Sequence, residues 1–499
     1  YIQYYDTDTN ILNTEITNTY FNLKIVQTDF VTIKEDVLVK KYSFINDSNI
    51  EQDIKFLIHS ELLSDQNNFI SGMKLDNGMV QFAHDFSMAT FSKSEKIFAG
   101  QVNGTSNNIG SGIIGGKDYV GMSRDSGISF DIGKLPAGHR KDIEICIYID
   151  ENKKTMHDFI DEVERIRKID FNKELNDTKA YWRKYVKEHD GLKIKEPQNS
   201  YEEKILNVYK RSILLFPLLM NEETGGIIAS PEVDEELSQC GRYAYCWPRD
   251  AVFITQALDI LKMNKEADKF YSEFCRITQS KNGMWEQRFY TDGRLAPCWG
   301  YQVDETASVV YGVYNHYEYT KNEEFLKENL HMCELAITFL KKYVYDVLEN
   351  TGKYSVSYDI WEENDRGIHM YSLASIFSAF DTMKKIYKAL GKNVSDFENN
   401  RLKEEKINKN IKEIDELMLK VKEYIEQNLY DENRKSYVRN TEDRRIDISL
   451  LGAVYPFNVF SPKEKKVLNT VENINLTLRT YTGGYQRYEY DHYRNGCPW

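Results

Sequence analysis

The sequence predicts an α+β chain of several domains: an antiparallel β-sandwich over residues 1–150, a helical linker over 151–195 and a toroid of paired helices over 196–499. Short runs of alternating apolar and polar residues fill the first part, with turn residues between them, as is typical of an antiparallel sandwich. Beyond about residue 200, apolar residues recur every three or four positions, which indicates successive helices. This change of period places the boundary between sheet and helices.

The strand signal is clearest near the end of the first part. Isoleucines alternate with other residues at positions 143, 145, 147 and 149, and turn signals such as Asn46-Asp47 break the earlier runs. Gly110-Ser-Gly112-Ile-Ile-Gly115 matches the dinucleotide-binding pattern, but that pattern requires a following helix. Strand-like sequence follows instead, so we predict a glycine-rich loop there.

Two charged amphipathic patterns predict the helices of the linker, and further helices follow it. They are expected at about 202–219, 250–262, 266–279, 304–320, 323–347, 368–390, 396–428 and 462–472. A ring of six helix pairs needs twelve helices, and about nine are visible across the second part, so we expect an incomplete ring. No short internal repeat is visible, which argues against a solenoid.

Composition excludes several classes of function. The net charge is −13 with no long basic run, so neither nucleic acid nor an anionic membrane is an expected partner. Seven scattered cysteines without a C-x-x-C motif predict free thiols, and nine histidines without H-x-H or H-x-x-x-H spacing predict no metal site. Scattered thiols and no visible signal favour a cytoplasmic location. Secretion stays open, because the chain begins at Tyr1 rather than Met.

The stretch from Tyr243 to Ala251 combines three aromatic rings, a guanidinium and a carboxylate immediately before a predicted helix. Asp250 stands where an N-cap would. Aromatic rings cover the apolar face of a sugar, while an Arg–Asp pair binds its hydroxyl groups. A buried aromatic turn with a structural ion pair is an equally good interpretation of this stretch alone.

The loop Tyr358-Asp359-Ile360-Trp361-Glu362-Glu363 is the strongest candidate for chemistry. Hydrolysis of a glycoside needs a carboxylic acid that protonates the leaving oxygen and a second carboxylate. A glutamate beside Trp361 and crowded by Asp359 and Glu363 would have a raised pKa, as a general acid requires. The alternative is an acidic helix N-terminus with Trp361 in the core.

Five motifs in order along the chain resemble those of glycoside hydrolase family 15, the glucoamylases in their bacterial two-domain form. The resemblance begins near residue 60 and is strongest from 225 onward. The motifs are Ala229-Ser230-Pro231, Tyr243-x-Tyr245-x-Trp247-Pro248-Arg249-Asp250, Gln302-Val-Asp304-Glu305-Thr306, Asp359-Ile-Trp361-Glu362-Glu363 and Gly484-x-x-Arg487-Tyr488.

The resemblance implies an N-terminal β-sandwich, a helical linker and an (α/α)6 barrel. It implies an exo-acting, inverting enzyme that needs no cofactor and releases β-glucose from non-reducing ends of maltooligosaccharides or α-glucans. Glu362 resembles the general acid. The implied substrate-binding residues are Tyr243, Trp247, Arg249, Asp250, Trp299, Gln302, Asp359, Trp361, Glu363 and Arg487.

Two departures from the family pattern matter. The family's Gly-Asn-Pro-Trp segment reads Gly496-Cys497-Pro498-Trp499 here. The family's general base lies beyond residue 499, so the resemblance supplies the acid and not the base. The family's N-terminal domain also begins earlier, and we therefore expect a sequence truncated at both ends.

Two alternatives stay open. The same scaffold could act on trehalose or on α-1,6-linked isomaltose or dextran. A protein of another class, a non-catalytic glucan-binding protein, would keep the pocket without the general base. Linkage preference, oligomeric state and bound ions cannot be predicted from these residues.

Overall fold

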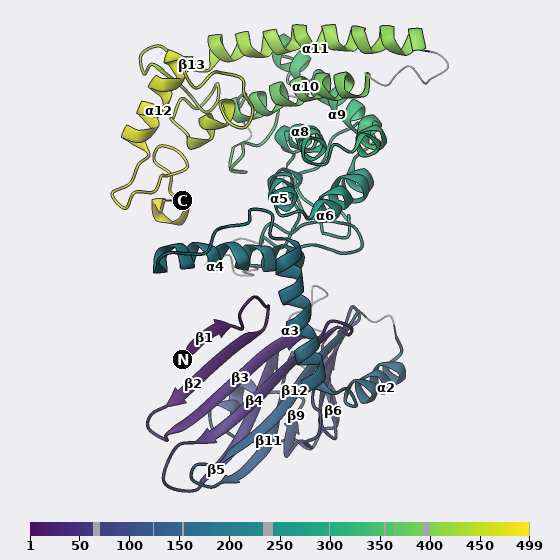
Figure 1. Cartoon of the computed structure of the whole chain (residues 1–499), viewed down its shortest axis with the longest axis vertical. Coiled ribbons are helices and arrows are strands. Elements are labelled where there is room, and N and C mark those ends of the chain that lie inside the picture. The colour runs from purple at the N-terminus through teal and green to yellow at the C-terminus, as the bar shows by residue number, and fades with distance from the viewer. Residues whose placement is uncertain are drawn as a thin grey trace. The chain divides into compact units, whose positions relative to one another are not determined.

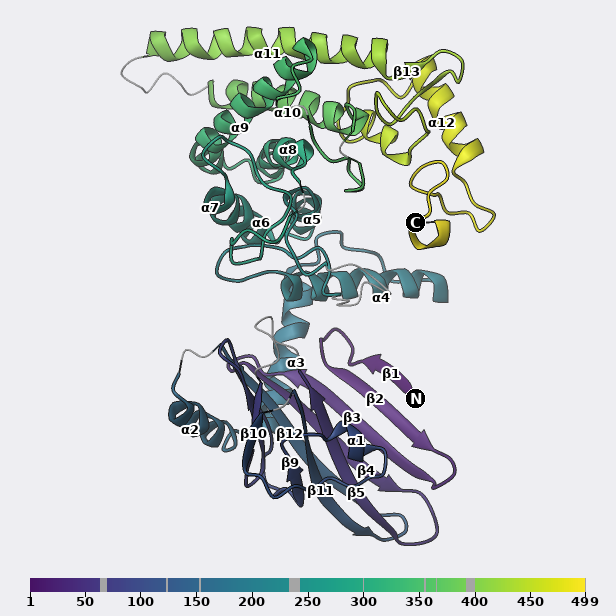
Figure 2. The ribbon, with the colours of Figure 1, turned by 180° about the vertical axis from the view of Figure 1, so that it is seen from behind.

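The first part of the chain folds into two antiparallel sheets. The computed structural model describes residues 1–62, 70–122, 124–151, 154–232, 243–298, 300–353, 356–364, 366–391 and 400–498. The larger sheet has the strand order β1-β2-β3-β4-β12-β8-β7-β6-β10, and the smaller has β5-β11-β9 (Figures 1 and 2). The strands are β1 Ile2–Tyr5, β2 Leu12–Asn18, β3 Leu23–Val31, β4 Val37–Asn46, β5 Gln52–Glu61, β6 Ser71–Leu75, β7 Gly78–Phe82, β8 Ser87–Ser92, β9 Ala99–Gln101, β10 Val120–Met122, β11 Asp125–Leu135 and β12 Arg140–Asp150.

Strand β12 is buried on both faces. Ile143 and Ile145 pack between the sheets with Phe130 of β11. Tyr148, on the other face, stacks on Phe159 of α2 (Met156–Ile166) with ring centroids 5.2 Å apart. The alternating isoleucines predicted a single apolar face, but a helix covers the second one. Ile149, at the strand end, is exposed.

The glycine-rich segment lies outside regular structure. Short helix α1 (Ser106–Ile109) precedes it, and residues 110–116 form turns and coil before β10. Gly112 has φ +73°, a left-handed conformation that glycine adopts without strain. No helix follows the glycines there, so the dinucleotide-binding arrangement is absent from residues 110–122.

The chain divides into two compact units, residues 1–188 with 196–214, and residues 189–195 with 215–499. Helices α3 (Phe171–Glu188) and most of α4 (Ser200–Leu215) belong to the first unit. Within it, the Arg211 guanidinium lies 4.0 Å from the ring centroid of Tyr5. The predicted domain boundaries at 150 and 195 stay a prediction.

The second unit is built mainly of helices, as its apolar period predicts. They are η1 Phe216–Leu219, α5 Pro248–Ile260, α6 Asn264–Lys269, η2 Phe270–Cys275, α7 Arg276–Thr278, α8 Val303–Thr320, α9 Glu323–Glu349, α10 Met370–Gly391, α11 Asn400–Asn428, η4 Ile448–Ala453, α12 Lys465–Thr477 and η5 Tyr493–Gly496, with a small hairpin of β13 Tyr430–Asp431 and β14 Ser436–Tyr437. None of the helices in the described ranges is long and apolar enough to span a bilayer.

One expected helix start is wrong. Asp250 was expected to cap α5, but the helix begins at Pro248 with Trp247 in the capping position, and Asp250 lies in the first turn. Proline suits a first helical position because its φ is already helical and the missing N–H has no partner there. Asp250 therefore keeps its carboxylate near the helix N-terminus without capping it.

Helices α5, α8 and α10 form an inner row. Helix α8 packs against both α5 and α10, α9 packs against α8 and α10, and α11 lies along α10 (Figure 1). Residues 303–310 of α8 are buried without interruption, as are residues 370–376 of α10. A helix buried on every face lies inside its domain. The loops that precede these three helices carry the candidate residues.

Candidate active site

The N-terminal ends of α5, α8 and α10 meet at one end of the inner row. Arg249 in the first turn of α5 donates from Nη1 to Asp304 Oδ2 of α8 at 2.9 Å. Trp247, which precedes α5, donates from Nε1 to Glu362 Oε1 at 2.5 Å, and Glu362 lies in the loop before α10. These side-chain contacts require the three helices to begin side by side.

Glu362 is held in an unusual backbone conformation. Its φ is +62°, in the left-handed region that few glutamates adopt. Its N–H donates to the carbonyl of Asp359 at 3.0 Å, which closes a tight turn. Sparsely populated conformations of this kind cluster at functional sites. The turn aims the carboxyl group at Trp247 and places Oε1 4.0 Å from Arg249 Nη2.

Burial raises the pKa of Glu362 above its ordinary value, since a carboxylate loses hydration there. Arg249, the Trp247 hydrogen bond and Arg288 oppose that rise, and Asp250 adds to it. We expected Asp359 and Glu363 to crowd Glu362, but their carboxylates are held by Arg439 and Arg487 instead. The like charge that raises this pKa is that of Asp250.

Arg249 is surrounded by carboxylates. Its Nη2 donates to Asp250 Oδ2 at 3.2 Å, its Nη1 lies 3.0 Å from Glu305 Oε1, and its backbone N–H donates to Glu305 Oε2 at 2.6 Å. Burial works against its charge, but Glu305, Asp250 and Asp304 together raise the Arg249 pKa well above its ordinary value. The Asp304 and Glu305 side chains have no exposed surface, whereas that of Asp250 is 42% exposed. Asp250 is therefore the member of this cluster that solvent or a ligand can reach.

A second ionic network holds the turn of Glu362 from behind. Asp359 accepts N–H bonds from Glu363 and Asn364 at Oδ1 and a bond from Arg439 Nη2 at Oδ2, 2.5 Å away. Arg439 Nε lies 3.4 Å from Asp447, which accepts the indole N–H of Trp361 at 2.9 Å. Arg439 thus joins Asp359 to Asp447, and Asp447 in turn holds the Trp361 ring.

The chain end approaches the same loop. Arg487 donates to Glu363 Oε1 at 2.6 Å and forms two further bonds with Asp491, 2.7 and 2.8 Å long. The Tyr488 hydroxyl donates to Glu363 Oε2. Arg487 also lies over the ring of Trp361, 5.4 Å from its centroid. Glu363 is therefore engaged by residues from more than a hundred positions away.

Aromatic rings line the α5 side. Tyr245 and Trp247 pack with Tyr290, and the Arg288 guanidinium lies 5.3 Å from the Trp247 ring centroid. The hydroxyl groups of Tyr243 and Tyr493 are 2.9 Å apart. These rings form one wall beside Glu362.

Gln302, the residue before α8, donates from Nε2 to the carbonyl of Asp359 at 2.7 Å and so braces the turn. The predicted site residue Trp299, like Trp499, lies outside the described residues. The other sequence-predicted site residues belong to one continuous set of contacts. In the described ranges, no three His, Cys, Asp or Glu side chains are grouped to hold a metal ion.

Several contributing residues were not assigned from the sequence. Asp304 and Glu305 stood inside a quoted motif without a role, and Arg439 and Asp447 were not singled out. A signal for Asp447 exists in the charged run Asp443-Arg444-Arg445-Ile446-Asp447, which has no helical period, whereas Arg439 stands four residues before that run. Such a run is usually solvated surface, and only the fold shows that its last two residues, Ile446 and Asp447, are buried.

A raised-pKa carboxyl beside a charged clamp and aromatic rings, where the N-terminal ends of three helices meet, is the kind of site that glycoside hydrolases have. The family model for glycosyl hydrolases family 15 matches residues 203–499. The chain belongs to that family, and the predicted resemblance is confirmed.

Two known proteins match almost the whole chain. An uncharacterized glycosyl hydrolase of Methanocaldococcus jannaschii is 26% identical over 511 aligned positions, which span 100% of this chain and 76% of that protein. The crystal structure of a bacterial glucoamylase complexed with acarbose matches with a TM-score of 0.75 and 16% identity, covering 98% of this chain and 72% of that one. The second match confirms the predicted fold.

A shorter match is to the trehalase of Mycolicibacterium smegmatis. It is 25% identical over 173 residues, which are 32% of this chain and 25% of that enzyme.

Proposed function

We propose that the protein is an exo-acting, inverting α-glucoside hydrolase of the glucan 1,4-α-glucosidase type. It removes glucose from the non-reducing ends of maltooligosaccharides or α-glucans and releases it as the β-anomer. The observation that carries the proposal is the position of Glu362: a carboxyl whose side chain is only 17% exposed, with a raised pKa, in contact with Trp247 and close to Arg249.

In the proposed reaction, protonated Glu362 donates its proton to the glycosidic oxygen as the bond to the anomeric carbon breaks. Water attacks that carbon from the opposite face and loses a proton to a second carboxylate. We assign no residue to that second carboxylate. The raised pKa keeps Glu362 protonated at a higher pH than an exposed glutamate.

The clamp residues have a separate role in this proposal. Arg249 is fixed by Asp304 and Glu305, which leaves the half-exposed Asp250 to accept hydrogen bonds from glucose hydroxyl groups. Tyr243 and Trp247 provide the ring surface. Binding energy at a terminal sugar positions the scissile bond against the acid.

Most of the remaining predicted substrate-binding residues hold the Glu362 turn in place and do not themselves bind the sugar in this proposal. Asp359 is 4% exposed, and both its oxygens are occupied by the backbone and by Arg439. We assign it, with Gln302 and Trp361, to holding the Glu362 turn. Glu363 and Arg487 form the far side of the loop, where a second sugar ring would lie.

The test follows glucose release by the purified protein. Wild-type protein should release glucose from maltotriose, first as the β-anomer by proton NMR, while Glu362→Gln should retain binding and lose turnover. Initial α-anomer, or undiminished turnover in Glu362→Gln, would contradict the proposal. Saccharide binding without turnover in the wild type would favour the non-catalytic alternative.

Trehalose is the second candidate substrate, and the similarity to a trehalase favours it. Trehalose also presents a terminal α-glucosyl unit, so the same clamp and acid would serve. Rates of glucose release from maltose, isomaltose and trehalose at equal concentration would decide. A preference for trehalose would replace the maltooligosaccharide assignment, and a preference for isomaltose would point to α-1,6 linkages.

A further inference from the structure

A cavity of ≈ 700 Å³ lies at the opposite end of the inner row from Glu362. Its lining comes from the second halves of α8 and α10, from Lys321 after α8 and Glu323 at the start of α9, and from Phe457 and Asn458, which follow η4. Asp304 is ten residues before Tyr314 in α8, so the cavity lies roughly 15 Å from the carboxylates of the active site along this helix. The cavity is therefore separate from the site described above. Its volume falls in the range of about 300–1,000 Å³ that is usual for ligand pockets.

One wall of the cavity is aromatic. Tyr311, Tyr314 and Tyr317 recur at helical spacing on one face of α8, and none of them is fully buried. Tyr311 meets Phe457 edge to face with ring centroids 6.2 Å apart, and the rings of Tyr314 and Tyr317 lie 5.7 Å apart. Tyr455, two residues before Phe457, is 78% exposed. Tyrosine rings that line a cavity suit the apolar face of a sugar, and the Lys321 ammonium lies 5.6 Å from the centroid of the Tyr317 ring.

The opposite wall, from α10, is polar. Ser378, Asp381, Thr382 and Lys385 line it at spacings of three and four residues, so they share one helix face. They offer hydroxyl, carboxylate and ammonium groups, which together can donate hydrogen bonds to sugar hydroxyl groups and accept bonds from them.

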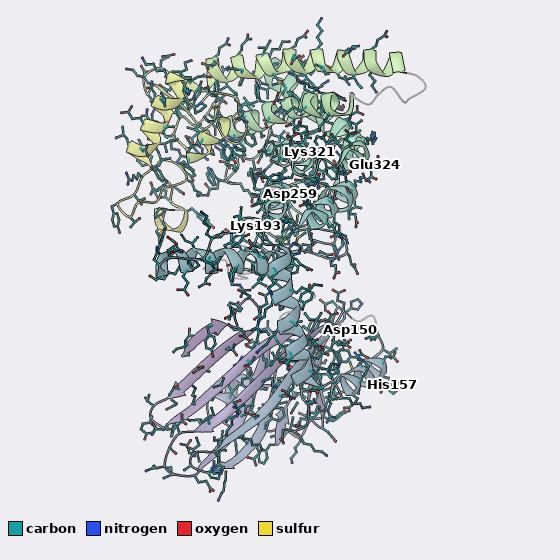
Figure 3. The ribbon with its side chains drawn as sticks, viewed as in Figure 1. Asp150, His157, Lys193, Asp259, Lys321 and Glu324 are labelled. Atoms are coloured by element: carbon teal, nitrogen blue, oxygen red, sulfur yellow. The ribbon has the colours of Figure 1, made fainter. Side chains whose placement is uncertain are left out.

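The charges of the cavity favour a neutral ligand. Three lysines and three carboxylates line it. The ammonium of Lys385 lies 2.7 Å from Asp381, and that of Lys321 lies 3.0 Å from Glu318 at the end of α8, where Figure 3 labels Lys321. Two of the three lysines are paired in this way, which makes those two poor sites for phosphate or another anion. A neutral polyhydroxylated ligand needs both kinds of group and no net charge.

We propose that this cavity is a second saccharide-binding site, which holds an α-glucan segment away from the catalytic carboxyl. The choice of an α-glucan as the ligand rests on the proposed function, whereas the existence of the site rests on the cavity and its lining. A second site keeps a long substrate attached while its end is hydrolysed, because binding at one place raises the effective concentration at the other.

Calorimetric titration with maltoheptaose tests the proposal in the Glu362→Gln background, where turnover is suppressed. Two saccharides should bind each chain, and adding Tyr314→Ala should remove one of them or weaken it at least tenfold. Tyr314→Phe keeps the ring and should bind within about threefold of the parent. Asp381→Asn, on the exposed part of the other wall, should weaken the same site without affecting folding.

The outcomes separate the two proposals. The second site would be overturned if Glu362→Gln bound one saccharide per chain both with and without Tyr314→Ala. It would also be overturned if Tyr314→Ala left the melting temperature unchanged and two saccharides still bound. If titration with inorganic phosphate released heat, and Tyr314→Ala abolished that heat, the cavity would be an anion site instead. Tyr314→Ala with wild-type Glu362 should hydrolyse maltose within twofold of the parent. If the parent hydrolyses no maltose, the proposed function fails while Tyr314-dependent binding still reports on this site.

Discussion

The indole N–H of Trp247 donates a 2.5 Å hydrogen bond to Glu362, and this contact joins the start of α5 to the loop before α10. Its effect on chemistry has a definite sign: the bond stabilises the carboxylate and so lowers the Glu362 pKa, against the larger rise due to burial. The contact therefore adjusts the pH range in which Glu362 stays protonated.

Replacing Trp247 by Phe removes that donor. The pKa of Glu362 should rise further, so the alkaline limb of the profile of kcat/KM against pH should move to higher pH. Initial rates on maltotriose across the pH range provide the measurement. A limb that moves to lower pH, or does not move, would show that the bond does not stabilise the carboxylate.

Changing Glu362 to Gln should reduce kcat by about 10²–10⁴-fold, the usual contribution of general acid catalysis. The same change should raise stability at neutral pH. A carboxyl with a raised pKa contributes its full stability only below its ordinary pKa and loses it as the pH rises through the folded value. Urea unfolding should thus give the variant a larger free energy of unfolding than the parent at pH 7, and the difference should become smaller towards pH 4. Glu363→Gln is the comparison variant: it breaks the ion pair with Arg487 and should therefore lower stability at pH 7 instead of raising it.

Arg249→Lys should lower kcat/KM by roughly 10- to 100-fold, because charge-assisted hydrogen bonds contribute about 1.5–3 kcal/mol each. A lysine keeps the charge but cannot bind Asp250, Asp304 and Glu305 in the geometry of the guanidinium. Steady-state kinetics on maltotriose measure the loss. Activity close to that of the parent would mean that charge alone suffices.

Arg439→Leu should destabilise the fold by about 3–5 kcal/mol, the loss expected when one partner of a buried ion pair is removed. It leaves Asp359 and Asp447 buried without their shared cation. Urea unfolding measures the difference. Because Arg439 acts through the Glu362 turn, any folded fraction should also show a shifted pH profile, which a purely structural role would not produce.

His316 gives the helical unit a pH-dependent stability. Its ring lies 2.7 Å from Asp259, which Figure 3 labels in α5, and 3.3 Å from Asp268 of α6. Burial opposes its charge, but bonds to both aspartates raise its pKa to about 9. The extra stability is complete below pH 6.5 and is lost as the pH rises towards 9. His316→Gln should show its largest deficit in urea unfolding at pH 6 and little deficit above pH 9. A deficit independent of pH would indicate packing alone.

Much of the fold followed from local pattern. The change of apolar period separated sheets from helices, and the ends of α8 and α9 lie within two residues of their predicted positions. The helix predicted over 266–279 is instead divided into α6, η2 and α7, because the apolar pattern cannot distinguish a π turn from an α turn. The second buried face of β12 was missed since it depends on α2, which packs there through tertiary contacts.

The position of the site could be predicted from the sequence, but the contacts among its residues could not. Motif residues such as Glu362 and Arg249 were found because unusual residue types gather before helices. Arg439, Asp447 and Arg288 were missed, since ordinary charged residues become partners only when the fold brings distant loops together. The like charge beside Glu362 was assigned to its sequence neighbours, while the turn directs those side chains away and brings Asp250 near.

The most direct test of the central claim is the anomeric form of the first glucose released from maltotriose, followed by proton NMR in wild-type protein and in Glu362→Gln. The account predicts β-glucose from the wild type and a loss of release in the variant. Release of α-glucose, or equal release by the variant, would contradict it.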